Sequence, residues 1–238
     1  MSYAAGQVPA SAELWQKGFV LASEQNDIQI AGAARAGTGL AALALGDLDR
    51  AEVLLRTALP LTEEAADAWM TSLVHVWLGT ILLARGDPAR ATVEIGDGLA
   101  LARERGDRLA IYVALYNLAQ AAVAQGDSAQ ARRHLVEGIE LSDQNHDVAN
   151  LAYFLEALAL VDAPARVPVL LGAAQALHER TEQKSYGYYR PDQSMRERVE
   201  EQVRQSLGDD AYAEALRAGR DLEVSGVVRF ALQPSAGE

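Results

Sequence analysis

Residues 67–106 read DAWMTSLVHVWLGTILLARGDPARATVEIGDGLALARERG, and the rest of the chain repeats their pattern. Residues 67–85 are rich in apolar side chains and contain no proline, whereas residues 88–105 carry apolar side chains at helical spacing. Between them, Gly86 can adopt the left-handed conformation that ends a helix, Asp87 can cap the next helix, and Pro88 is tolerated in a first turn. The stretch therefore predicts two antiparallel helices joined by a tight turn.

The pattern returns every 40 residues in three registers that agree with one another. Their members are the turn glycines Gly46, Gly86 and Gly126, the capping aspartates Asp27, Asp67, Asp107 and Asp147, and the small residues Gly18, Ala58, Gly98 and Gly138. An ordinary alanine-rich helical bundle is the alternative, but such a bundle does not require a common period. The repetition predicts an all-α array in which each helix pair buries its apolar face against the next pair.

Small residues also occupy fixed places within each period, where two helices can approach closely. They are Gly39, Gly79, Ala119 and Ala159 on the first helices, and Ala51, Ala91 and Ala131 on the second, followed by the aliphatic Leu55, Ile95 and Leu135. This spacing resembles that of the tetratricopeptide repeat, although the period here is 40 residues and the usual one is ~34. The resemblance implies a right-handed α-solenoid of antiparallel helix pairs with a helical C-terminal cap.

The period also predicts the domain organisation. We expect a linker or disordered segment over residues 1–11 and an array over 12–164, which consists of a half-repeat (12–26), three repeats (27–66, 67–106 and 107–146) and a degenerate repeat from 147; a helical cap follows over 165–238. The half-repeat lacks a first helix, so we expect Trp15 and Phe19 to be exposed as a candidate interface. Either the preceding residues shield this face or the chain is part of a longer protein, and we favour the second interpretation.

The C-terminal region suggests a family. LLGAAQALHER at 170–180, SLGDDAYAEALRAGR at 206–220 and RFAL at 229–232 resemble the C-terminus of ATP-dependent LuxR-type and AfsR-like bacterial transcriptional regulators. The resemblance covers residues 12–232 and implies an array that receives inducers or partner proteins. The phosphate-binding loop of that family is absent from this sequence, and we find no convincing DNA-reading helix-turn-helix. We therefore expect the sensor or scaffold portion alone, or a stand-alone relative.

Composition and motifs narrow the function further. The formal net charge of -12 disfavours direct binding to nucleic acid, and the absence of cysteine excludes disulfides and thiolate sites. No signal peptide or run of ~18 apolar residues is present, so we expect a cytoplasmic protein that does not span a membrane. The four histidines form no HExxH motif, and no Gly-x-Ser-x-Gly elbow occurs. We expect no enzyme activity, no cofactor and no metal.

Alignment of the first helices by 40 residues gives candidate binding residues. The aligned rows are Ala36, Val76, Tyr116 and Glu156; Leu40, Thr80, Gln120 and Leu160; and Ala33, Leu73, Val113 and Tyr153. Polar and aromatic members of these rows, together with the isolated charge Arg35, predict a groove site for a protein, a peptide or a small effector; the set is Arg35, Thr80, Tyr116, Gln120, Tyr153 and Glu156. Packing against the C-terminal segment would use the same residues, so both interpretations stay open.

A tyrosine-rich stretch supplies the last candidates. Tyr186, Tyr188 and Tyr189 stand beside Arg190, a composition typical of interface anchors. The alternative is that these tyrosines fold back over the last helix pair. The overall prediction is a non-catalytic binding module, and the alternative is a structural module that forms a homodimer through the N-terminal half-repeat.

Overall fold

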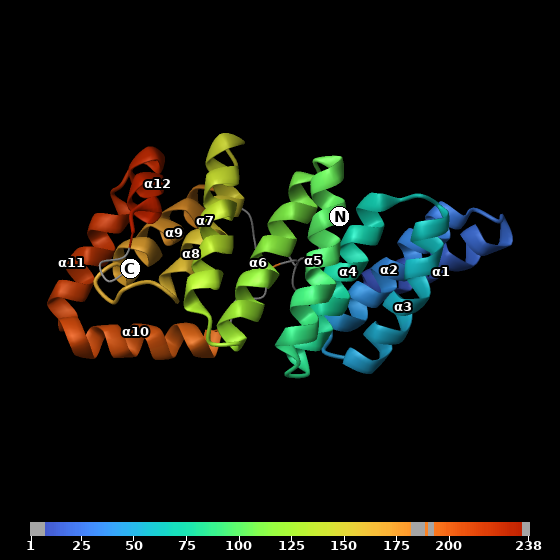
Figure 1. The fold of residues 1–238 in the computed structure, drawn as a ribbon, viewed down its shortest axis with the longest axis horizontal. Helices are drawn as coiled ribbons and strands as arrows, with labels where there is room; N and C mark the ends of the chain where they lie inside the picture. The colour runs from blue at the N-terminus through green and yellow to red at the C-terminus, as the bar shows by residue number, and fades with distance from the viewer. Residues whose placement is uncertain (1–7, 182–188, 190–192, 235–238) are drawn as a thin grey trace. The chain divides into compact units, whose positions relative to one another are not determined.

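The computed structural model describes residues 8–181, 189 and 193–234, and the regular elements of these residues are all helices (Figure 1). In chain order they are α1 (Val8–Glu24), α2 (Ile28–Ala44), α3 (Leu48–Glu64), α4 (Ala68–Ala84), α5 (Pro88–Arg105), α6 (Arg108–Ala124), α7 (Ser128–Gln144), α8 (Val148–Ala159), α9 (Val167–Thr181), α10 (Gln193–Leu207), α11 (Asp209–Arg220) and α12 (Val224–Leu232). The helices form two compact units, one with α1–α6 and the other with α7–α12. The predicted all-α fold is confirmed.

The turns between the repeat helices use one recurring chemistry. A residue with positive φ precedes each capping aspartate, and these residues are Asn26, Gly46, Ala66, Gly86, Gly106, Gly126 and His146. The aspartate then accepts a hydrogen bond from the backbone N–H three residues later, as Asp67 does from Met70 at 3.0 Å and Asp127 from Gln130 at 2.8 Å. Because each cap satisfies an N–H that has no partner within the helix, the aspartate register fixes where each helix begins.

Small residues let the paired helices touch, as the sequence predicts. A Cβ atom added to Gly39 of α2 would lie 2.8 Å from Leu55 Cδ2 of α3. A Cβ atom at Gly98 of α5 would lie 2.7 Å from the carbonyl oxygen of Ser72 in α4. Contacts this short leave no room for a side chain, so glycine sets the separation of the paired helices.

In the first unit, the first helices of successive repeats adjoin one another. Helix α2 contacts α4, and α4 contacts α6, while α3 and α5 pack against these first helices. The apolar core lies between the layers and includes Leu40, Leu55, Leu73 and Trp77. In the second unit α7 pairs with α8, and α9 packs on α8 as the second helix of the degenerate repeat; α11 in turn packs on α9.

Two N-terminal expectations require correction. Helix α1 includes residues from Val8, ahead of the predicted start at residue 12, because Pro9 is tolerated in a first helical turn. Trp15 and Phe19 are half-buried instead of exposed. The Trp15 ring lies on α2, where a Cβ atom added to Gly37 would come within 2.6 Å of it. The exposed large apolar side chains of α1 are instead Leu14, Val20 and Leu21, at 69%, 46% and 57% exposure.

Candidate functional site

Three groove candidates of the first unit lie on α4 and α6. Thr80 donates to the Val76 carbonyl at 2.9 Å and to Asn117 Oδ1 at 3.2 Å, which joins α4 to α6 through polar side chains. Thr80 and Gln120, which the 40-residue period makes equivalent, are both half-buried, whereas Tyr116 is only 3% exposed and belongs to the core. Asn117 was not predicted, and its only signal is that it is one of two amides, with Gln120, in a largely apolar helix.

Arg35 of α2 lies under α1. Its guanidinium carbon is 3.6 Å from the centre of the Phe19 ring, so a predicted groove residue and a predicted interface residue contact each other. The Nε atom is buried and has no hydrogen-bond partner among the described residues. Burial also lowers the pKa of Arg35 from its ordinary value. The cation–π contact therefore carries the favourable interaction of this charge within the described structure.

In the next repeat, the residue equivalent to Arg35 has a carboxylate beside it. Its equivalent 40 residues later, His75, lies 2.8 Å from the Glu94 carboxylate of α5. The residue of the first repeat that corresponds to Glu94 is Leu54. The first repeat thus has a cation at the place where the second repeat has a histidine–carboxylate pair, and it has no carboxylate at the corresponding position.

The candidates of the second unit come together on α8. Glu156 is 8% exposed. Its carboxylate accepts a hydrogen bond from Arg196 of α10 and lies 3.6 Å from His178 Nε2 of α9. Burial by itself raises the pKa of Glu156, but His178 and Arg196 outweigh this effect and hold the pKa below its ordinary value. Arg196 also donates to Glu200 at 2.7 Å, so the buried carboxylate is one end of a charged chain.

Aromatic rings adjoin this carboxylate. Tyr153, one helical turn before Glu156, packs edge-on against the His178 ring at a centroid separation of 4.8 Å. The Tyr189 ring lies 4.4 Å from the Tyr153 ring, and its hydroxyl donates to Asn150 Oδ1. Tyr189 is only 4% exposed. The alternative in which a tyrosine folds back over the last helix pair therefore describes Tyr189, whereas Tyr186, Tyr188 and Arg190 lie outside the described residues.

The structure thus brings Tyr153, Glu156 and Tyr189 into one cluster. Their contacts are with α8, α9 and α10, which is the arrangement expected if these residues pack against the C-terminal segment. The residues that complete the cluster, His178 and Arg196, were not predicted as site residues. Each lies on a different helix from Glu156; Arg196 follows Glu156 by 40 residues, but it lies in the C-terminal segment, beyond the predicted repeat array.

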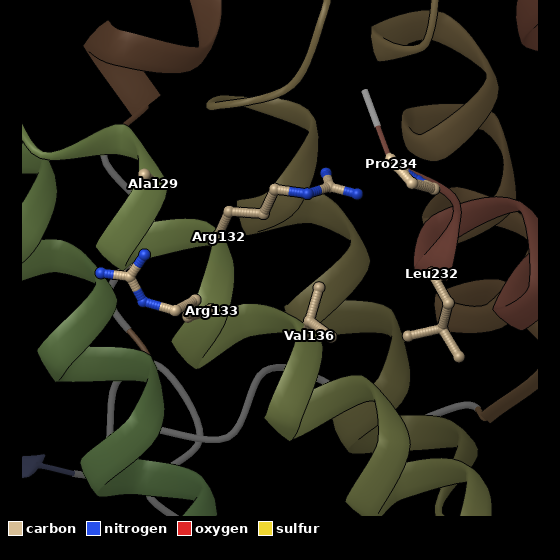
Figure 2. A pocket seen from close by; sticks show the side chains of 6 residues that line it. All are labelled: Ala129, Arg132, Arg133, Val136, Leu232 and Pro234. Atoms are coloured by element: carbon tan, nitrogen blue, oxygen red, sulfur yellow. The ribbon is translucent and has the colours of Figure 1, made fainter. Parts of the chain in front are cut away.

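A separate cleft of about 340 Å³ lies between α7 and the end of α12 (Figure 2). It is lined by Ala129, Arg132, Arg133, Val136, Leu232 and Pro234. Arg132 donates to Asp162 at 2.8 Å and to the Gln233 carbonyl at 2.6 Å, and Arg166 donates to the same Asp162 and to the Phe230 carbonyl. The two guanidinium groups therefore hold the carbonyl-rich C-terminal end of α12, where cations are favourable.

Within residues 8–181, 189 and 193–234, no cluster of three histidine, aspartate or glutamate side chains is arranged to hold a metal ion. In the same part of the chain, no helix combines the length and the apolar character needed to cross a membrane. Glu156 and Asp162 form ion pairs with arginines of other helices or loops.

Comparisons with known proteins agree on the repeat. The family model described as "Tetratricopeptide repeat" matches residues 32–57, 72–94 and 112–137. The crystal structure of BtubC (BKLC) from P. vanneervenii is similar in fold, with a TM-score of 0.65 over 99% of this chain and 95% of that chain, at 19% sequence identity. No curated protein sequence matches the chain. The chain therefore carries tetratricopeptide-type repeats in an all-α fold.

Proposed function

We propose that this chain is a non-catalytic binding and scaffold domain that engages a protein or peptide through the first helices of its repeats. Tetratricopeptide-type repeats generally mediate protein interaction or scaffolding. The observation that carries the proposal is the serial contact of α2, α4 and α6, because it aligns their side chains in one row. Thr80 and Gln120 are equivalent half-buried polar residues of this row and would supply hydrogen bonds to a bound segment.

The test is a thermal-shift screen of the full chain against a library of peptides and metabolites. A ligand at ~100 times its dissociation constant adds ~2.7 kcal/mol to the free energy of unfolding. For a chain of this size that gain raises the melting temperature by roughly 5–10 °C. If no member of a broad library raises the melting temperature, the proposal is wrong.

A ligand found in this way can be placed by substitution. Thr80→Val and Gln120→Ala should weaken its binding, because they remove polar groups from the row of first helices. Thr57→Val is the matched control, since Thr57 is an exposed threonine of α3 that hydrogen-bonds to its own helix. Equal effects of Thr80→Val and Thr57→Val would exclude the first helices as the binding surface.

We further propose that the domain is the sensor or protein-interaction portion of a bacterial transcriptional regulator of the LuxR-type or AfsR-like class. The support is the sequence resemblance of residues 170–180 and 206–220. Deletion of the coding region in the source organism should then change the abundance of a defined set of transcripts. An unchanged transcript profile, under conditions where the protein is made, would exclude this role.

Self-association is the second candidate function, and the α1 surface favours it. Leu14 and Leu21 are two helical turns apart and are both exposed. Leu54, which corresponds to Leu14 in the next period, is 8% exposed and packs near Gly39 of α2. Leu14 therefore exposes a leucine whose counterpart in the next repeat is buried.

Light scattering on the double variant Leu14→Glu/Leu21→Glu tests this candidate. A dimer held together by α1 should become a monomer, because two carboxylates would have to be buried at its interface. Val53→Glu/Val93→Glu is the matched control, since these valines are 64% and 65% exposed on α3 and α5. A wild-type chain that is already monomeric at high concentration would rule out self-association.

A further inference from the structure

The Glu156 carboxylate has the surroundings of a binding site for a guanidinium group. It is almost fully buried, and the rings of Tyr153 and His178 adjoin it. Aromatic rings and a carboxylate are the two kinds of group that attract an arginine side chain. In this structure the arginine comes from the same chain, since Arg196 of α10 donates to Glu156.

The helix that supplies Arg196 is lightly anchored. Val203 is the one fully buried residue of α10, while Met195, Val199 and Leu207 are half-buried. Helix α10 also contacts α9 and α11; on α11, the Tyr212 hydroxyl donates to Glu200 at 3.1 Å and Arg204 lies over the Tyr212 ring. A helix with so little buried surface opens at a low free-energy cost compared with the core helices.

Movement of α10 away from α8 would leave one buried charge without its partner. Glu156 would lose its arginine and stay in a buried position, where an unpaired carboxylate is unfavourable. An apolar side chain cannot pair with this carboxylate, whereas an arginine from another molecule would restore the ion pair. The exchange of one arginine for another conserves the charges and the hydrogen bonds of the site.

We propose that α10 is an exchangeable latch on α8 and α9, and that an arginine-bearing helical segment of a partner protein displaces it by binding Glu156 in place of Arg196. The structure described here, in which Arg196 of α10 binds Glu156, is then the closed form of the site. This inference concerns α8 of the second unit and not α2, α4 and α6, and it does not depend on the binding proposed for those three helices.

The chain provides its own probe for the test, which is a synthetic peptide with the sequence of residues 193–207. Hydrogen exchange of the full-length wild-type chain would be measured with and without a saturating amount of this peptide. We expect amide exchange in α10 to accelerate at least tenfold when the peptide is present, while exchange in α8 and α9 stays unchanged. A peptide with alanine in place of the arginine that corresponds to Arg196 should have no effect.

Fluorescence anisotropy of the labelled peptide gives an independent measurement. The full-chain variant Arg196→Ala should bind the peptide at least tenfold more tightly than the wild type, because its own arginine no longer competes. Glu156→Gln should abolish binding. Glu179→Gln is the matched control, since Glu179 is an exposed carboxylate of α9 that pairs with Arg220, and this variant should bind as the wild type does.

Several outcomes would overturn the proposal. One is peptide binding without faster exchange in α10, and another is equal binding of the arginine and alanine peptides. Circular dichroism would verify that each variant is folded, so that lost binding reports on the site. Exchange in α10 that is as slow as in α9, with or without the peptide, would show that α10 is a fixed part of the fold.

Discussion

Substitution of Gly172 by alanine tests the closest helix contact of the second unit. Gly172 lies on α9 and faces the backbone of α11. A Cβ atom added there would be 3.0 Å from the carbonyl carbon of Leu216 and 3.2 Å from the Arg220 nitrogen, and closer still to the Leu216 oxygen. Gly219 of α11 faces the backbone of Val169 in the same way, so each helix presents a glycine to the other.

The expected change in the free energy of unfolding is the balance of two opposed effects. Replacement of glycine by alanine inside a helix is itself favourable by ~1 kcal/mol. The added methyl group must however push α11 away, because a backbone carbonyl cannot rotate aside as a side chain can, and overpacking of this kind costs ~1–3 kcal/mol. We place Gly172→Ala at the upper end of that range and expect a net loss of about 1–2 kcal/mol.

The assay is thermal unfolding followed by circular dichroism, with Gly96→Ala as the control. Gly96 lies inside α5, and a Cβ atom added there would meet no atom within 4 Å. Gly96→Ala should therefore raise the melting temperature by a few degrees, whereas Gly172→Ala should lower it by roughly 2–8 °C. If both variants gain stability, α9 and α11 do not meet at these glycines and the contact described here is wrong.

Three further substitutions give distinct expected outcomes. Ala66 has a φ of 52°, so Ala66→Gly should stabilise the chain by about 1 kcal/mol in urea denaturation, and an unchanged midpoint would contradict the left-handed turn. The pKa of Glu156 lies below its ordinary value of 4.5, so its stabilisation is present above that pH and is lost as the pH falls through the lower folded value. Glu156→Gln should therefore flatten the stability profile below about pH 4.5, and an identical acid profile would refute the ion pair. Asp162→Asn should accelerate hydrogen exchange in α12 several-fold, because Arg132 and Arg166 lose their shared carboxylate; unchanged exchange would show that the two arginines do not position α12.

The fold could be predicted from the sequence because its determinants are local and repeated. Each turn needs a residue that tolerates positive φ and an aspartate that caps the next helix, and both recur at the same spacing. Asn26, Ala66 and His146 also adopt positive φ, so the glycine register marks only some of these turns. An aspartate caps each helix from α2 to α8: the register of Asp27, Asp67, Asp107 and Asp147 marks every second helix, and Asp47, Asp87 and Asp127 mark the helices between them, so aspartate is the more complete signal.

The candidate sites could be predicted only in part, because their contacts are neither local nor periodic. Trp15 corresponds to Leu55 in the next period, and Leu55 packs on the first helix of its own repeat. The described residues contain no such helix before α1, and the indole instead lies on Gly37 of the following helix. Glu156 was recognisable as a charge among apolar residues, but its partner Arg196 is on a helix outside the repeat pattern.

One position within the repeat shows how successive repeats are joined by hydrogen bonds and how this junction differs at α7. Arg85, at the end of α4, donates to Asp49 and Glu52 of α3, and Gln125, at the end of α6, donates to Thr92 of α5. Glu52 and Thr92 are equivalent, and the next equivalent is Arg132.

Arg132 reverses the direction of this junction. A carboxylate or hydroxyl at the earlier positions accepts a hydrogen bond from the following first helix, whereas Arg132 donates to Asp162 and to the last carbonyls of α12. A guanidinium at this position cannot accept a hydrogen bond from a following first helix, but it can hold the carbonyl end of a helix. The change from acceptor to donor therefore lets this one position bind both the turn after α8 and the C-terminal end of α12.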